Sequence, residues 1–237
     1  SFFERLLQTC KKNKWEQAYS QLKDQGRMHI DISAFPSKFF YEENLFPIMD
    51  WQKESLKLTD SKNGEMDSWI ANNRVLFFST ENLKENNASN KINYNEAKTI
   101  ATLVQSILRV YEQSNDAINA SQIGIIAPYR NQIALIKQQL AIANIPDHEQ
   151  ISVDTVERYQ GSQRDIILLS FCVNKAYQLD FLCNLNHDGT VDRKLNVALT
   201  RARKQLFMVG NAQILHHHPI YATLLDFVKD RKVVLKG

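Results

Sequence analysis

The chain has 237 residues, 43% of them apolar and 23% charged, which is the composition of a folded globular protein and excludes the disordered and collagen-like classes. Its 29 basic and 26 acidic residues give a net charge of +3, which permits a polyanionic partner without indicating one. Three scattered cysteines without a CxxC pair exclude a disulfide framework, and no apolar run is long enough for a membrane span or ordered like a signal peptide. We therefore expect a cytoplasmic protein with no membrane partner.

The first part of the chain, residues 1–70, is predicted to be a segment of helices and loops that leads into the main domain. Residues 1–24 carry apolar side chains at helical spacing, and residues 25–48 are dense in aromatics and interrupted by two prolines. The polar stretch 50–73 is predicted to be surface structure rather than an interdomain linker.

After residue 73 the pattern changes to short apolar runs divided by amphipathic helices. The predicted strands are 74–80, 123–127, 151–154, 165–173 and 205–209, and the predicted helices are 95–113, 132–143, 194–203 and 220–229. Strands that are apolar on both faces and separated by helices are typical of a parallel sheet covered on both sides. The sequence therefore predicts an α/β domain that spans residues 71–237.

Three segments next to these strands are rich in Arg, Tyr, Gln and Thr. PYRN follows the strand at 123–127, TVERYQGSQRD follows the strand at 151–154, and NVALTRAR precedes the strand at 205–209. Ligands of parallel α/β sheets usually bind at the carboxyl ends of the strands, and these side chains carry the donors that fit phosphate oxygens and bases. The three segments are the first places to look for a binding site.

The most specific of these segments belongs to the run LNVALTRARKQLFMVGN, residues 195–211, which resembles motif VI of superfamily 1 helicases. Three other runs resemble further family segments in the family's order: QGRMHIDISAFPSKFFYEENL the QYRMHP segment, IGIIAPYRNQIALI the strand and loop that opens the nucleic-acid groove, and VDTVERYQGSQRDIILLSF motif V. The chain is most similar to superfamily 1B, the branch that contains the nonsense-mediated-decay RNA helicase and the Okazaki-fragment nuclease-helicase. The resemblance implies a RecA-like C-terminal domain with a P-loop NTPase-type fold.

The resemblance also implies a set of nucleotide contacts. The arginine of LTRA, Arg201, would reach the γ-phosphate of ATP bound to a neighbouring RecA-like domain, and Arg27 would be a second contact to the phosphate. Positive charge on a transferring phosphoryl group is worth roughly 10³ to 10⁵ in rate. The other residues that the resemblance places at the nucleotide are Gln25, Gly161, Gln163 and Arg203.

A second implied site holds single-stranded DNA or RNA. Its residues in this chain would be Pro128, Tyr129, Arg130 and Thr155, where stacking and contacts to phosphates bind a strand without reading its sequence.

Two positions depart from the family's pattern. Gly26 stands where relatives have a tyrosine that stacks on adenine, so base stacking must come from elsewhere or base discrimination is weak. Gln163 stands where relatives have a glutamate that binds the ribose hydroxyls, although an amide oxygen can also accept from a hydroxyl.

The sequence contains neither a GxxxxGK[ST] P-loop nor an apolar strand that ends in Asp-Glu. We therefore expect ATP and Mg to be held by the first RecA-like domain of the same polypeptide, N-terminal to Ser1, with no metal ligand in this chain. The expected function is the C-terminal motor domain of an ATP-dependent helicase, inactive as an isolated fragment. A non-catalytic nucleic-acid or protein binding module derived from a helicase remains the alternative, whereas a Rossmann-type enzyme is disfavoured because GxGxxG is missing.

Overall fold

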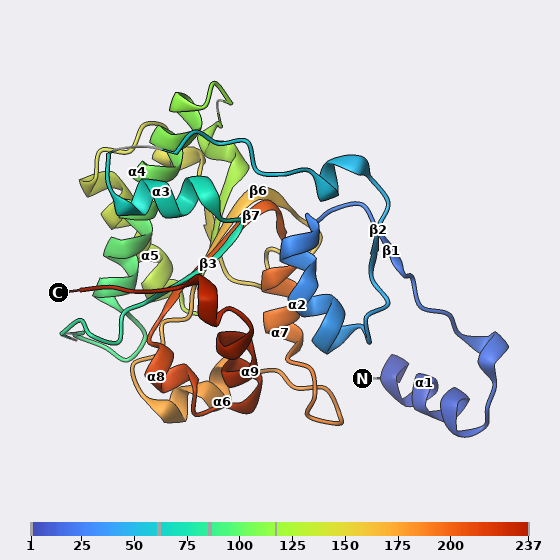
Figure 1. The fold of residues 1–237 in the computed structure, drawn as a ribbon. Coiled ribbons are helices and arrows are strands. Elements are labelled where there is room, and N and C mark those ends of the chain that lie inside the picture. The colour runs from blue at the N-terminus through green and yellow to red at the C-terminus, as the bar shows by residue number, and fades with distance from the viewer. Residues whose placement is uncertain (1, 61–62, 85–86, 117, 237) are drawn as a thin grey trace.

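The computed structural model describes residues 2–60, 63–84, 87–116 and 118–236, and its centre is a six-stranded sheet whose strands all run parallel (Figure 1). The strand order is β5-β4-β6-β7-β3-β8. The strands are β3 (Val75–Ser79), β4 (Ile123–Ile126), β5 (Ser152–Asp154), β6 (Arg164–Ser170), β7 (Ala202–Gly210) and β8 (Lys232–Val234).

The strands are buried on both faces because their apolar side chains alternate between two hydrophobic cores. In β3, Leu76 and Phe78 belong to one core, whereas Val75 and Phe77 belong to the other. Successive side chains of a strand point to opposite faces, so a continuous apolar run fits a sheet with helices on both sides.

Helices cover both faces of the sheet, as Figure 1 shows. One core is closed by α3 (Glu65–Asn72), α4 (Tyr94–Gln113) and α5 (Arg130–Ile142). The other is closed by α2 (Ile30–Phe40), α6 (Leu179–Leu182), α7 (Arg193–Leu199), α8 (Ala212–Leu215) and α9 (Pro219–Phe227). The predicted fold class, an α/β domain with a parallel sheet and helices on both faces, is confirmed.

The N-terminal part has its own small sheet, in which β1 (Asp24–Gln25) pairs in parallel with β2 (Phe46–Pro47). Helix α1 (Phe2–Lys12) lies apart from the main sheet in Figure 1. The short 3-10 helices are η1 (Glu16–Ala18), η2 (Asp50–Lys53), η3 (Ala120–Gln122), η4 (His148–Gln150), η5 (Ala176–Gln178) and η6 (Lys229–Arg231).

The division of the chain at residue 70 stays a prediction. Ile32 and Phe35 of α2 are buried in a core of the main sheet, so packing against the sheet begins well before residue 71. Helix α2 therefore packs against the main sheet although it belongs to the predicted lead-in.

One predicted helix boundary is wrong, and one strand of the main sheet was not predicted. The helix expected at 194–203 ends at Leu199, because Arg201 O accepts a hydrogen bond from Arg164 N and Ala202 pairs with Arg164 at the start of β6 and β7. Strand β8 was not expected from the sequence; it pairs with β3 at one edge of the sheet. Within the described part of the chain, no helix has both the length and the apolar character of a membrane span.

Candidate functional site

The residues singled out by the sequence lie at the two ends of the parallel strands. We call the side of the sheet where the strands begin its amino edge, and the side where they end its carboxyl edge. Pro128 and Thr155 follow the carboxyl ends of β4 and β5, which are paired at Ile126 and Asp154. Gln163 and Arg201 precede the amino ends of β6 and β7. Only the first pair lies at the carboxyl edge, where ligands of parallel sheets are usually sought.

At the amino edge, Arg27 and Arg201 are brought together around Thr200. Arg27 Nη1 donates to the carbonyl oxygen of Thr200 at 3.2 Å, and Arg201 Nη2 donates to the hydroxyl of Thr200 at 3.2 Å. The hydroxyl in turn donates to Asn196 O at 2.8 Å, which fixes its orientation as an acceptor for Arg201. Thr200 follows the last residue of α7, so the end of this helix sets the position of both guanidinium groups.

Arg201 is held mainly by backbone oxygens and is only 9% exposed. Its Nε donates to Val197 O at 3.0 Å, and its Nη1 donates to Ser162 O at 3.3 Å. Burial lowers the pKa of Arg201, and the positive charge of Arg27 lowers it further. Among the contacts of the described residues, neither arginine pairs with a carboxylate, so two cations share one place without a counter-charge. Such an arrangement favours the binding of an anion.

Gln163 belongs to the same group. Its Oε1 accepts from Arg27 Nε at 3.1 Å, which orients the guanidinium without neutralising it. Nearby Gly161 has φ +85°, a left-handed conformation that favours glycine, and a Cβ built there would meet no atom within 4 Å. The backbone of this turn is therefore open to a close approach.

Gln25 lies beside Arg27 but its side chain is used within the loop. Its Oε1 accepts from Arg27 N at 3.0 Å and from Met28 N at 2.8 Å, and its Nε2 donates to Met28 O at 2.9 Å. Gln25 thus shapes the turn that carries Arg27.

Arg203 is not brought to this group by its contacts. It lies on β7, donates from Nη1 to Asp165 Oδ1 at 3.0 Å, and stands over the ring of Trp51 at 5.1 Å. Because its charge already faces a carboxylate, Arg203 does not share the uncompensated charge of Arg27 and Arg201.

At the carboxyl edge, Pro128 and Tyr129 line a cavity of about 170 Å³. Lys194 and Glu157 also line it and are joined by an ion pair of 3.1 Å. Burial raises the pKa of Tyr129, so its hydroxyl stays protonated at neutral pH. The cavity is thus lined by apolar side chains together with this ion pair.

The other two residues expected at a nucleic acid lie close to this cavity in the chain but do not line it. Arg130 is the exposed first residue of α5, and Thr155 directly follows β5. The backbone N–H of Thr155 donates to Asp154 Oδ1 at 2.8 Å, so this N–H already has a partner within the chain.

The described residues contain no group of three or more His, Cys, Asp or Glu side chains arranged to hold a metal ion. The chemistry of the amino edge is instead that of two guanidinium groups, which fit the oxygens of a phosphate chain.

Sequence reasoning missed two residues that build the amino edge. Thr200 binds both arginines, and it stands within the LTRA run that drew attention to Arg201. Gln52 bonds the loop that carries Arg27, although it lies in the polar stretch 50–73, which the sequence predicts to be surface structure. No local pattern marks it, because all its partners are backbone atoms.

Comparison with known proteins matches residues 1–213 to a family described as an AAA domain. Similar curated proteins include the regulator of nonsense transcripts 1 homolog of Drosophila melanogaster, 32% identical over 92% of this chain and 17% of its own length, and the DNA replication ATP-dependent helicase/nuclease JHS1 of Arabidopsis thaliana, 31% identical over 99% and 17%. Helicase sen1 of Schizosaccharomyces pombe is 30% identical over 89% of this chain and 12% of its own length. The chain thus spans less than a fifth of each of these relatives.

Among solved structures, the C-terminal domain of a possible DNA helicase from Lactobacillus is 13% identical, with a TM-score of 0.43 over 89% of this chain and 98% of that chain. The HK97 bacteriophage large terminase is also 13% identical, with a TM-score of 0.40 over 89% of this chain and 44% of that chain.

Proposed function

The chain belongs to this AAA domain family, as the C-terminal RecA-like domain of a superfamily 1B helicase, and on that premise we propose that it is the second motor domain of an ATP-dependent DNA or RNA helicase. In this proposal it contributes arginines to ATP hydrolysis and part of the track for a single strand. The division into a lead-in of residues 1–70 and a domain of residues 71–237 is part of the same proposal.

The observation that carries the proposal is the pair of uncompensated guanidinium groups at the amino edge. Arg27 and Arg201 converge on Thr200, and the charge of one lowers the pKa of the other. A triphosphate would relieve this repulsion and bind both groups. We place ATP and its Mg on the first RecA-like domain of the same polypeptide, where the metal would be held and the phosphate chain bound.

The work of this chain's residues is then electrostatic. Arg201 would stabilise the charge that spreads over the oxygens of the transferring γ-phosphoryl group, and Arg27 would hold the same group in place. Both contacts exist only when the two domains close, so ATP favours the closed state and hydrolysis weakens it. Gly161 and Gln163 would lie next to the nucleotide.

The single-stranded DNA or RNA would bind at the carboxyl edge, along Pro128, Tyr129, Arg130 and Thr155. Residues 155–163 run from the carboxyl end of β5 to the amino end of β6, so one short segment joins the two sites. A movement of Arg27 and Arg201 on hydrolysis would therefore be passed through this segment to the bound DNA or RNA.

Turnover of ATP distinguishes the motor from a binding module derived from a helicase. We expect the polypeptide that contains both RecA-like domains to release phosphate from Mg-ATP in the presence of single-stranded DNA or RNA, and the isolated 237-residue chain to release none. A two-domain polypeptide that binds the strand without turnover would favour the binding module. Turnover by the pure isolated chain would contradict the placing of ATP on another domain.

A further inference from the structure

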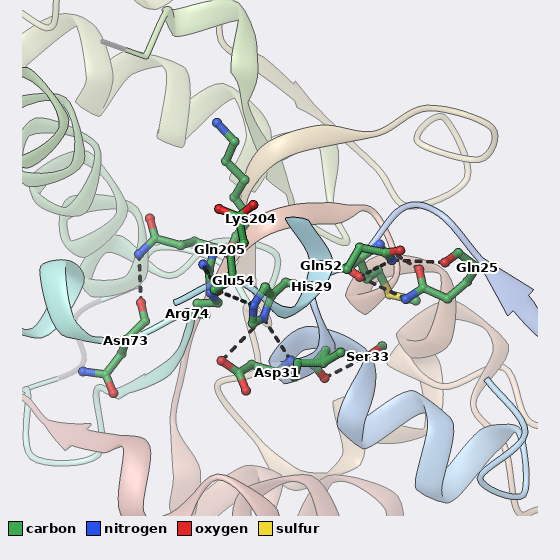
Figure 2. A network of polar contacts seen from close by, with 12 residues as sticks. Gln25, His29, Asp31, Ser33, Gln52, Glu54, Asn73, Arg74, Lys204 and Gln205 are labelled. Atoms are coloured by element: carbon green, nitrogen blue, oxygen red, sulfur yellow. Dashed lines mark hydrogen bonds and ion pairs between the residues drawn. The ribbon is translucent and has the colours of Figure 1, made fainter. Parts of the chain in front are cut away.

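The loop that carries Arg27 is held on both sides by one buried side chain from another segment. Gln52 lies in η2 and is 0% exposed. Its Nε2 donates to Gln25 O at 3.1 Å and to Met28 O at 2.6 Å, the two backbone carbonyls on either side of the Gly26-Arg27 pair. Figure 2 shows Gln52 and Gln25 meeting at this point.

All the hydrogen-bonding capacity of Gln52 is used. Besides the two donated bonds, its Oε1 accepts from Ile48 N at 3.0 Å and from Met49 N at 2.8 Å. An amide has two donor hydrogens and an oxygen that accepts two bonds, so this buried group is fully satisfied. It ties the loop after β1 to the segment after β2.

The far end of the same loop is fixed to the main sheet. His29 N donates to Arg203 O of β7 at 3.0 Å, and the side chain of Met28 is 3% exposed in the core. The near end is held by the pairing of β1 with β2, in which Ile48 N donates to Gln25 O at 3.3 Å, and by Gln52, which adds a bond to the same carbonyl. The backbone at Arg27 lies between these attachments and the one at His29.

We propose that Gln52 is a positioning residue for Arg27: it holds the loop in the conformation that brings the guanidinium to Gln163 Oε1 and Thr200 O. Its effect on ATP hydrolysis rests on the proposed function, whereas its effect on the conformation of the loop does not. The chemistry requires an amide, because a carboxylate has no hydrogens to donate to the carbonyls of Gln25 and Met28.

The test compares Gln52 with a second glutamine that is equally buried but makes no hydrogen bond to this loop. Gln205 is 0% exposed, donates to Ile70 O and Asn73 O at 2.8 Å each, and accepts from Tyr111 at 2.9 Å. Gln52→Met and Gln205→Met remove the same group from the same degree of burial. In the two-domain polypeptide, below the melting temperature of both variants, we expect Gln52→Met to lower kcat about 10²-fold with little change in KM, since a shift of about 1 Å at a catalytic group has this effect. Gln205→Met should leave kcat within about twofold, because Gln205 bonds neither of the two arginines nor Thr200 nor the loop that carries Arg27.

Two further measurements keep the test decisive. Gln52→Glu retains the bonds from Ile48 and Met49 and turns a carboxylate oxygen towards the two loop carbonyls in place of the donated bonds, so it is a second, independent test of the same attachment. In an Arg27→Ala background, either variant should have no additional effect on kcat, because the residue it positions is gone. The proposal would be overturned if Gln52→Met lowered kcat no more than Gln205→Met does. It would also be overturned if a change at Gln52 lowered kcat of the Arg27→Ala variant by the same factor as it lowers kcat of the unmodified protein.

Amide hydrogen exchange separates the two claims. We expect the amides of Arg27 and Met28 to exchange at least tenfold faster in Gln52→Glu than in the unmodified chain, with no nucleotide present. Faster exchange together with an unchanged kcat in Arg27→Ala would contradict the role of Arg27 in hydrolysis and leave the loop attachment intact. Unchanged exchange would contradict the attachment itself.

Discussion

Arg27 and Arg201, which lie near opposite ends of the chain, both donate to Thr200, one to its carbonyl oxygen and one to its hydroxyl, each at 3.2 Å. Two guanidinium groups this close repel each other, and the pKa of Arg201 is lowered accordingly, after the larger effect of burial. The fold therefore keeps an electrostatically costly pair at the amino edge of the sheet. An anion bound between them would offset that cost, which is the physical basis of the proposed function.

The stability of the chain should fall in mildly acidic solution because of His29. Burial lowers the pKa of His29 below 6.5, with a further contribution from Arg74, and its ring bonds Glu54 O and Asp31 N. The unfolded chain therefore binds a proton more readily than the folded chain, so this stability is complete above the unfolded pKa and is lost as the pH falls below about 6.5 towards the folded pKa. Melting temperatures between pH 8 and 5 should fall less steeply for His29→Asn; parallel curves for the two proteins would contradict this.

Removal of Arg109 should destabilise the packing of α3 against α4. Arg109 bonds both carboxylate oxygens of Asp67, at 2.6 and 2.7 Å, and Asp67 is 1% exposed. Arg109→Leu takes the guanidinium away from a buried carboxylate, and we expect a loss of about 1–3 kcal/mol in the free energy of unfolding.

The matched control is the exposed pair of Arg158 and Asp154, 3.4 Å apart. Arg158→Leu should change the free energy of unfolding by no more than about 1 kcal/mol, because exposed ion pairs contribute little. Urea unfolding of both variants measures the difference, and equal effects would show that the burial of Asp67 does not matter.

Gly124 in β4 should not tolerate a methyl group. A Cβ at this position would lie 2.7 Å from the hydroxyl oxygen of Tyr159 and 2.9 Å from side-chain atoms of Arg164 and Ile167. Gly124→Ala should cost about 1–3 kcal/mol, the usual effect of overpacking a core. Gly26→Ala is the control, since its Cβ would approach Ile48 only to 3.6 Å. A thermal melt in which both variants behave alike would contradict this account of the packing.

The sequence predicted the main sheet well because its strands are apolar on both faces. Strands β3, β4, β5, β6 and β7 were all expected near their observed positions. Strand β8 (Lys232–Val234) was not, because it lies at the edge of the sheet with no fully buried residue, and its pairing with β3 depends on a distant segment. The end of α7 was misplaced because helical spacing continues into LTRAR, while the pairing of Ala202 with Arg164 depends on a distant segment.

The candidate site was only partly predictable. Family motifs pointed to Arg27 and Arg201. Their contacts with Thr200 could not be predicted from residue spacing, because they depend on the tertiary structure. Arg203 was expected at the nucleotide, yet its ion pair with Asp165 links it to a residue of another strand. Gln52 had no signal at all, because a side chain that bonds only backbone atoms leaves no pattern in the residue types around it.

The most direct test of the central claim is the effect of Arg201→Ala on the two-domain polypeptide, measured as ATP turnover and as affinity for single-stranded DNA or RNA. We expect kcat to fall by roughly 10³ to 10⁵, as for the loss of an arginine finger, while strand affinity changes little because Pro128 and Thr155 lie at the opposite edge of the sheet. Unchanged turnover would contradict a role for Arg201 at the phosphate. Equal losses of turnover and strand affinity would show that Arg201 only supports the fold.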